Sequence, residues 1–152
     1  MSRTNAAEQN YLQHWFQNAD WPNIGDAAGL QNSLAAGNFY VSLHTADPGE
    51  AGNQTTNEAT FVNYTRQAVP RSAAGWAVAD AGGGAWTADN VNPITFPEAG
   101  SGPQVITHFG IGTNPTPDAG NLIWSGALTA PRTVDVGITL QFAAGALNVQ
   151  AD

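Results

Sequence analysis

The chain has 152 residues, the length of a single domain, and apolar residues make up 42% of it. Only 11% of the residues are charged: four arginines face twelve carboxylates, lysine is absent, and the net charge is −8. This acidity argues against a protein that binds nucleic acid or an anionic membrane through clustered cations, and the absence of cysteine excludes disulfides and zinc–thiolate sites.

A helix is predicted close to the N-terminus. Asn5 and Glu8 have the spacing of a capping box, which is typical of a helix start. Trp21–Pro22 is expected to end this helix, because proline disfavours the helical conformation in the residue before it. A second short helix is predicted from Asp26, as its N-cap, to Gly37, as its C-terminal stop. Residues 1–37 are therefore expected to form a helical N-terminal arm.

The first predicted helix carries an aromatic stripe at helical spacing, made of Tyr11, Leu12, Trp15 and Phe16. Two interpretations are open. The stripe can cover one end of the domain's own core, or it can dock on a neighbouring subunit. These four residues are the candidate partner-docking site.

From Phe39 onward the hydrophobic pattern changes to period two. The predicted strands are residues 39–45, 61–69, 75–79, 94–96, 105–112, 121–128, 138–142 and 146–150. Turn signals separate them, among them Asp47–Pro48–Gly49 and a hairpin tip at Gly82–Gly84. Short strands at this spacing predict an antiparallel β-sandwich, jelly-roll-like, over residues 38–152. The expected fold class is mainly β with a short helical segment in front.

The residues of types that bind metal ions gather near the first strand and its turn. They are His44, Asp47 and Glu50, with His108 further along the chain. Their spacing matches neither a zinc site nor an EF-hand, and an aspartate before proline is typical of a turn. We therefore expect a strand followed by a turn, with no bound metal.

Other catalytic and binding motifs are weak. Ser101 and Ser125 lack the G-x-S-x-G context of an activated serine, and most carboxylates lie in turns, where solvated acids are expected. Gly82–Gly84 lacks the lysine that follows in a phosphate-binding loop. Three tryptophans lie in strand-like segments: Trp76, Trp86 and Trp124. Burial in a core or interface is the favoured interpretation of them, and a sugar-stacking platform is the alternative. We expect no enzyme, no catalytic residue and no cofactor.

Four segments of the sequence occur in an order that is found in a known family. They are VSLHTADPGEAG, YTRQAV, ITFPEAGSGPQVITHFGIG and GNLIWSGALTAPRTVDVGITLQFAAGALNV. With them the chain resembles small virion structural proteins of tailed bacteriophages, which are labelled as tail-fibre or minor structural proteins. The resemblance runs from about Phe39 to Val149. It implies a virion component without catalytic residues.

Within the virion, the sequence favours a capsid cement or decoration protein on the outer surface of the head. A compact β domain, a gripping arm and an acidic surface suit that position, whereas a fibre shaft needs coiled-coil heptads or repeated modules. The alternative is an adhesion module at the tail tip or tail fibre, binding a receptor or sugar. The expected partners are the major capsid protein or other virion proteins and further copies of the chain, as a dimer or trimer. We expect a soluble protein, assembled in the host cytoplasm, that contacts neither nucleic acid nor membrane.

Overall fold

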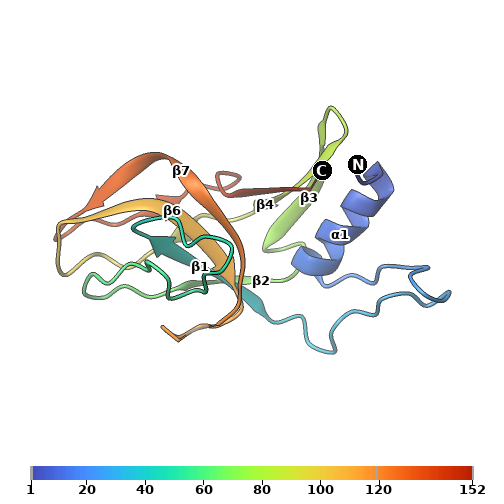
Figure 1. The fold of residues 1–152 in the computed structure, drawn as a ribbon, viewed down its shortest axis with the longest axis horizontal. Coiled ribbons are helices and arrows are strands. Elements are labelled where there is room, and N and C mark those ends of the chain that lie inside the picture. The colour runs from blue at the N-terminus through green and yellow to red at the C-terminus, as the bar shows by residue number, and fades with distance from the viewer. Residues whose placement is uncertain (1, 119, 152) are drawn as a thin grey trace. The chain divides into compact units, whose positions relative to one another are not determined.

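The computed structural model describes residues 2–118 and 120–151 (Figure 1). The chain forms two compact units. Unit 1 consists of Met1–Asn38, Pro70–Pro93 and Phe142–Asp152, and unit 2 consists of Phe39–Val69 and Ile94–Gln141. The sequence predicts a boundary after residue 37, and the first strand begins there, at Asn38. The two compact units do not follow this boundary alone, because each is built from ranges that are distant in sequence.

Unit 1 contains the helix α1 (Asn5–Gln17). Its N-cap is Thr4, one residue before the expected cap, and the Thr4 side chain accepts a hydrogen bond from Ala7 N. The helix ends at Asn18, whose backbone adopts the left-handed conformation with φ of 53°. The stop therefore comes from a C-cap residue that precedes Trp21–Pro22.

A three-stranded antiparallel sheet supports α1 in unit 1, in the order β3-β4-β9. Its strands are β3 (Trp76–Gly82), β4 (Ala85–Asn90) and β9 (Asn148–Ala151). The turn between β3 and β4 contains Gly82–Gly84, all with positive φ, which confirms the predicted hairpin tip. The central strand β4 was not among the predicted strands, although Trp86 was counted as lying in a strand-like segment. Apart from this tryptophan its residues are small or polar, so the period-two signal is weak.

The core of unit 1 forms between α1 and this sheet. Leu12, Phe16 and Trp76 are completely buried, and the rings of Phe16 and Trp76 meet edge to face with centroids 4.7 Å apart. Gln17 also donates a hydrogen bond to Trp76 O at 2.9 Å. The apolar stripe of α1 therefore supplies core residues of the chain itself.

Unit 2 is organised around a four-stranded sheet with the order β2-β1-β6-β7. Its strands are β1 (Asn38–His44), β2 (Gln67–Pro70), β6 (Gln104–Gly112) and β7 (Leu122–Val134). A two-stranded sheet pairs β5 (Ile94–Thr95) with β8 (Gln141–Phe142). The register of β1 against β6 runs from Tyr40↔Gly112 to His44↔His108. Val41, Ile106 and Ile111 are fully buried at its centre.

The predicted fold class, mainly β with antiparallel sheets and one N-terminal helix, is confirmed. The strand pairings do not establish a jelly roll. Within the described ranges, no helix is long and apolar enough to cross a membrane.

The second predicted helix, from Asp26 to Gly37, is wrong. Trp21 and Leu30 instead exchange two backbone hydrogen bonds of 2.9 Å each, as an antiparallel bridge. Asp26 caps a turn rather than a helix, because its Oδ1 accepts from the backbone N–H groups of Ala28 and Gly29. Gly29 has φ of +70°, and a Cβ there would lie 2.1 Å from Trp21 O, so the close bridge needs glycine at this position.

Candidate functional site

Unit 2 contains a buried ion pair between Arg66 and Glu58. Arg66 Nε donates to Glu58 Oε1 at 2.7 Å and Arg66 Nη2 donates to Glu58 Oε2 at 2.8 Å, which is the bidentate geometry. The same guanidinium donates to the backbone carbonyls of Asn114, Thr116 and Asp118. One buried cation therefore neutralises a carboxylate and fixes the loop that joins β6 to β7.

Tyr64 extends this ion pair toward β1. Its hydroxyl donates to Glu58 Oε1 at 3.0 Å and accepts a hydrogen bond from Leu43 N at 3.0 Å. Its ring lies edge-on to Phe61 and stacks on Phe96. Burial, together with the nearby negative charge of Glu58, raises the pKa of Tyr64 far above its usual value. The hydroxyl thus keeps its proton and serves as a structural bridge.

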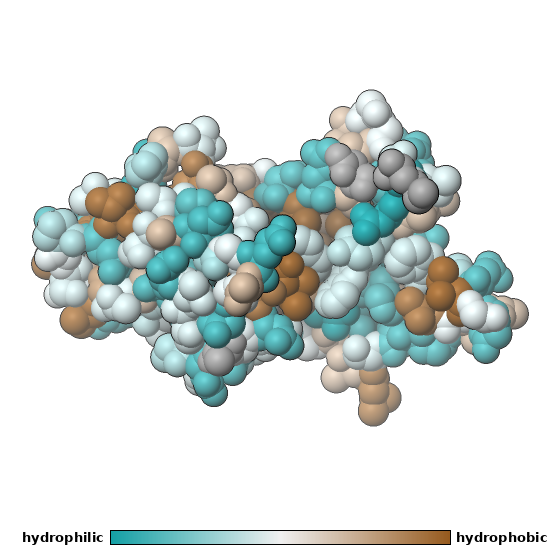
Figure 2. Space-filling view, in the orientation of Figure 1, coloured by the Kyte–Doolittle hydropathy of each residue, from teal (hydrophilic) through white to brown (hydrophobic). Residues whose placement is uncertain are grey.

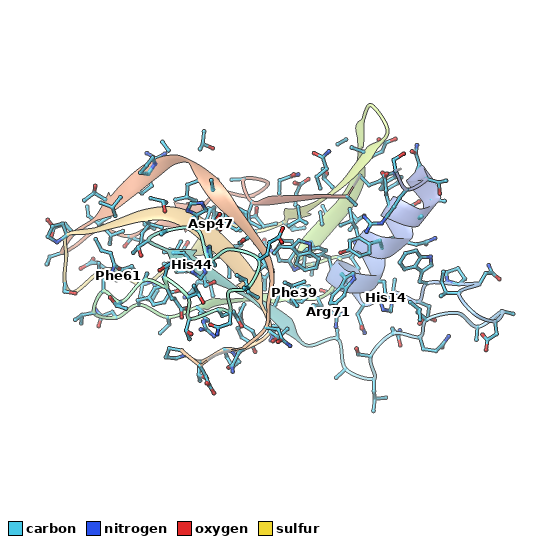
Figure 3. All side chains as sticks on the ribbon, viewed as in Figure 1. His14, Phe39, His44, Asp47, Phe61 and Arg71 are labelled. Atoms are coloured by element: carbon cyan, nitrogen blue, oxygen red, sulfur yellow. The ribbon has the colours of Figure 1, made fainter. Side chains whose placement is uncertain are left out.

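His44 lies at the end of β1 and is completely buried (Figure 3). Its Nδ1 lies 2.9 Å from the carbonyl of Thr56, so this nitrogen must donate. In the neutral ring Nε2 then accepts from the hydroxyl of Ser42 at 2.8 Å. A Cβ on Gly110 of β6 would come within 2.7 Å of both His44 Nε2 and Ser42 Oγ, so the neighbouring strand leaves no room for a further group. His44 is a packed and fully hydrogen-bonded core residue.

We predict that His44 makes unit 2 less stable in acid. Burial lowers the pKa of His44, so the unfolded chain binds a proton at a higher pH than the folded chain does. The free energy of unfolding should be fully retained above the ordinary histidine pKa of about 6.5, and should fall as the pH drops through that value toward the lower folded-state pKa. Urea unfolding between about pH 5 and pH 8 measures this slope. His44→Gln should flatten this slope, and an unchanged slope in His44→Gln would contradict the assignment.

Asp47 lies in the turn that follows β1, exposed to solvent. Its Oδ1 accepts from Gly49 N at 2.9 Å, and Gly49 has φ of +70°, which glycine adopts without strain. The side chain of Asn57 donates to Asp47 O at 3.0 Å and holds the turn in place. The prediction of a strand followed by a turn is confirmed.

Among residues 2–118 and 120–151, no three His, Asp or Glu side chains gather closely enough to form a metal site.

The serine and tryptophan candidates have structural surroundings. Ser101 Oγ accepts a hydrogen bond from Val62 N at 2.8 Å, and Ser125 lies exposed on β7. Trp76 is completely buried, so it offers no face to a sugar, and Trp124 packs edge-on against Phe39. Burial, the favoured interpretation of the strand-borne tryptophans, holds for Trp76.

The four candidate docking residues separate into two pairs in the structure. Leu12 and Phe16 are buried within unit 1, so both side chains are core residues. Tyr11 and Trp15 are half-buried, with their ring centroids 6.4 Å apart, and the guanidinium of Arg3 lies 4.5 Å from the centre of the Tyr11 ring. A docking role stays a prediction for Tyr11 and Trp15.

Arg71 is an important residue that sequence reasoning missed. It donates to the carbonyls of His14 and Trp15 in the last turn of α1, and to the carbonyl of Ala36 (Figure 3). The last carbonyls of a helix have no partner within the helix and carry partial negative charge, which a guanidinium compensates. Burial lowers the pKa of Arg71. The only available signal was that arginine is rare in this chain.

Arg71 also anchors the segment of residues 19–37, called here the apolar arm. Asn18 fixes the arm in both directions, because its side chain donates to Ser33 O and accepts from Ser33 N. Asp20 accepts from Asn32 N at 2.7 Å. These bonds hold an ordered hairpin-like arm whose apolar side chains face solvent; they are Ile24, Leu30 and Leu34, exposed by 44%, 44% and 108%. Figure 2 shows hydrophobic surface on this segment, including a projection below it.

Comparison with known proteins identifies one matching family. The family is described as Podophage GP4 fiber I protein gp80, and its model matches residues 2–150. No curated protein matches the chain.

Proposed function

Since the chain belongs to the family described as Podophage GP4 fiber I protein gp80, we propose that it is a non-enzymatic structural component of a phage fibre, associated with the tail. The observation that carries this proposal is the match to the family over residues 2–150, nearly the whole chain. The description of the family favours the tail-fibre alternative over the capsid cement protein expected from the sequence. The partners on this proposal are other virion proteins.

The polar groups of unit 2 support a structural role. Arg66, Glu58 and Tyr64 bind one another and the backbone, and both ring nitrogens of His44 are engaged in hydrogen bonds. Catalysis needs a group that is held ready for a substrate, whereas these groups stabilise a loop and a strand end. Unit 1 in turn carries an ordered apolar arm, a feature that suits attachment to another protein.

The position in the virion can be tested on intact particles of the phage that encodes the chain. We expect antibodies raised against the purified chain to label the fibres in immunogold electron microscopy. Fibres sheared from the particles should contain the chain by mass spectrometry, and the heads that remain should lack it. Label over the head surface would contradict the proposal and would restore the capsid cement interpretation.

A further inference from the structure

Unit 1 contains buried polar atoms that the rest of the chain does not satisfy. Glu8 lies on the same stripe of α1 as Leu12 and Phe16, and it is 1% exposed. Its carboxyl oxygen Oε2 has no hydrogen-bond partner among residues 2–118 and 120–151, and the same holds for the indole Nε1 atoms of Trp76 and Trp86. Buried polar groups in folded proteins almost always have a partner, so these atoms indicate that one is bound.

The indole of Trp86 lies on the face of the sheet that α1 covers. Trp76 meets the ring of Phe16 and is paired with Asn90 across β3 and β4, and paired residues share a face. Side chains alternate along β4, so Trp86 and Ala88 lie on the same face as Asn90. Helix α1 contacts both β3 and β4. Trp86 and the buried stripe of α1 therefore face the same layer of unit 1.

Glu8 and Trp86 lie at the same end of this layer. Glu8 is eight residues, about 12 Å, from Phe16 toward the N-terminal end of α1. Trp86 is paired with Asp80, which lies about 13 Å beyond Trp76 along β3. The N-terminal end of α1 points toward the β3–β4 tip, as Figure 1 shows. A buried acceptor and a buried donor therefore come to the same level without bonding to each other.

We propose that a water molecule is bound between α1 and β4, where it donates a hydrogen bond to Glu8 Oε2 and accepts one from Trp86 Nε1. The bound molecule must do both, which argues against a metal cation, because the indole N–H group points its positive end at the site. It must also be small, since Leu12 and Ala88, the next residues toward the centre of the layer, are completely buried. A polar site of this size suits a single buried water.

This water gives the N-terminal half of α1 a polar connection to the sheet. The C-terminal half is already fixed, because Gln17 donates to Trp76 O and Arg71 binds the carbonyls of His14 and Trp15. Trp76 Nε1 lies at that C-terminal end and is not part of the site. The proposal concerns unit 1 alone and does not depend on where the protein lies in the virion.

Nuclear magnetic resonance of the isotope-labelled full-length chain tests for this water. A water molecule that tumbles with the protein gives a negative nuclear Overhauser cross-peak to a nearby N–H proton, and freely exchanging surface water does not. We expect this cross-peak at the indole N–H of Trp86, whose signal is identified by its disappearance in Trp86→Phe. A wild-type chain without the cross-peak would overturn the proposal, and so would an indole proton that contacts Glu8 directly and no water.

Glu8→Gln and Glu8→Leu are the matched pair of variants. Gln keeps an oxygen that accepts a hydrogen bond, so Glu8→Gln should keep the water cross-peak. Leu is apolar and of similar size, so Glu8→Leu should lose the cross-peak while the remaining indole signals show that the chain is folded. A cross-peak that persists in folded Glu8→Leu, or that disappears in folded Glu8→Gln, would show that the Glu8 oxygen does not hold the water.

Discussion

Replacing Arg66 by alanine is expected to destabilise unit 2 by about 3–5 kcal/mol, the usual cost of leaving one member of a buried ion pair without its partner. In the folded chain Glu58 would keep a buried charge, and among residues 2–118 and 120–151 the Tyr64 hydroxyl would be its remaining donor. Three carbonyls of the loop between β6 and β7 would lose their donor at the same time. Amide hydrogen exchange around Asn114 and Thr116 should therefore become faster.

The unfolding of each unit can be followed separately with fluorinated tryptophan. Of the five tryptophans, Trp124 alone lies in unit 2, so its fluorine NMR signal reports that unit across a urea titration. Arg132→Ala is the matched control, because Arg132 is exposed on β7 and should cost less than about 1 kcal/mol. A similar loss of stability in Arg66→Ala and Arg132→Ala would show that the buried pair contributes little. The single variants Glu58→Leu and Arg66→Leu should each lower the free energy of unfolding of unit 2. The double variant Glu58→Leu/Arg66→Leu should lower it by well under the sum of those two decreases.

Replacing Phe16 by alanine is expected to destabilise unit 1 by about 3–5 kcal/mol, as large-to-small changes at buried aromatic residues do. Phe16 is completely buried and meets the ring of Trp76 at 4.7 Å, so its removal leaves a cavity between α1 and β3. If Phe16 were a docking residue only, the isolated chain would keep its stability. The outcome therefore separates a core residue from an interface residue.

The measurement is again fluorine NMR, with the Trp76 signal reporting unit 1. Tyr11→Ala is the control on the same helix, because Tyr11 is half-buried and lies on the rim of the core. We expect its loss of stability to be clearly smaller than that of Phe16→Ala. A Phe16→Ala chain that unfolds at the urea concentration of the wild type would return Phe16 to the candidate docking site.

The sequence predicted well those features whose causes are local. The first strand and its turn follow from period-two alternation and from an aspartate before proline. Helix α1 follows from apolar residues at helical spacing, and the tip at Gly82–Gly84 from a run of residues that accept positive φ. In each case the atoms that decide the structure lie within a few residues of one another. The likeness to phage virion proteins was also visible, since it depends on the order of short segments.

Other local patterns are ambiguous. An aspartate followed by small residues can cap a helix or a turn, and Asp26 caps a turn. What decides between them is the pair of hydrogen bonds from Trp21 to Leu30, which the sequence does not reveal. The same reason explains why the central strand β4 was missed: its strand conformation depends on pairing with β3 and β9 more than on its own residues.

The sequence by itself determined the class of the fold, the turn at Asp47 and the relation to phage virion proteins. Only the tertiary structure decided which apolar and charged residues are inside. Leu12 and Leu34 are both leucines in the N-terminal segment, yet one is fully buried and the other fully exposed. Arg71 reaches carbonyls more than fifty residues earlier in the chain, and Arg66 reaches the loop around Thr116. Burial is set by partners that are distant in sequence, whereas turns and helix ends are set by hydrogen bonds between near neighbours.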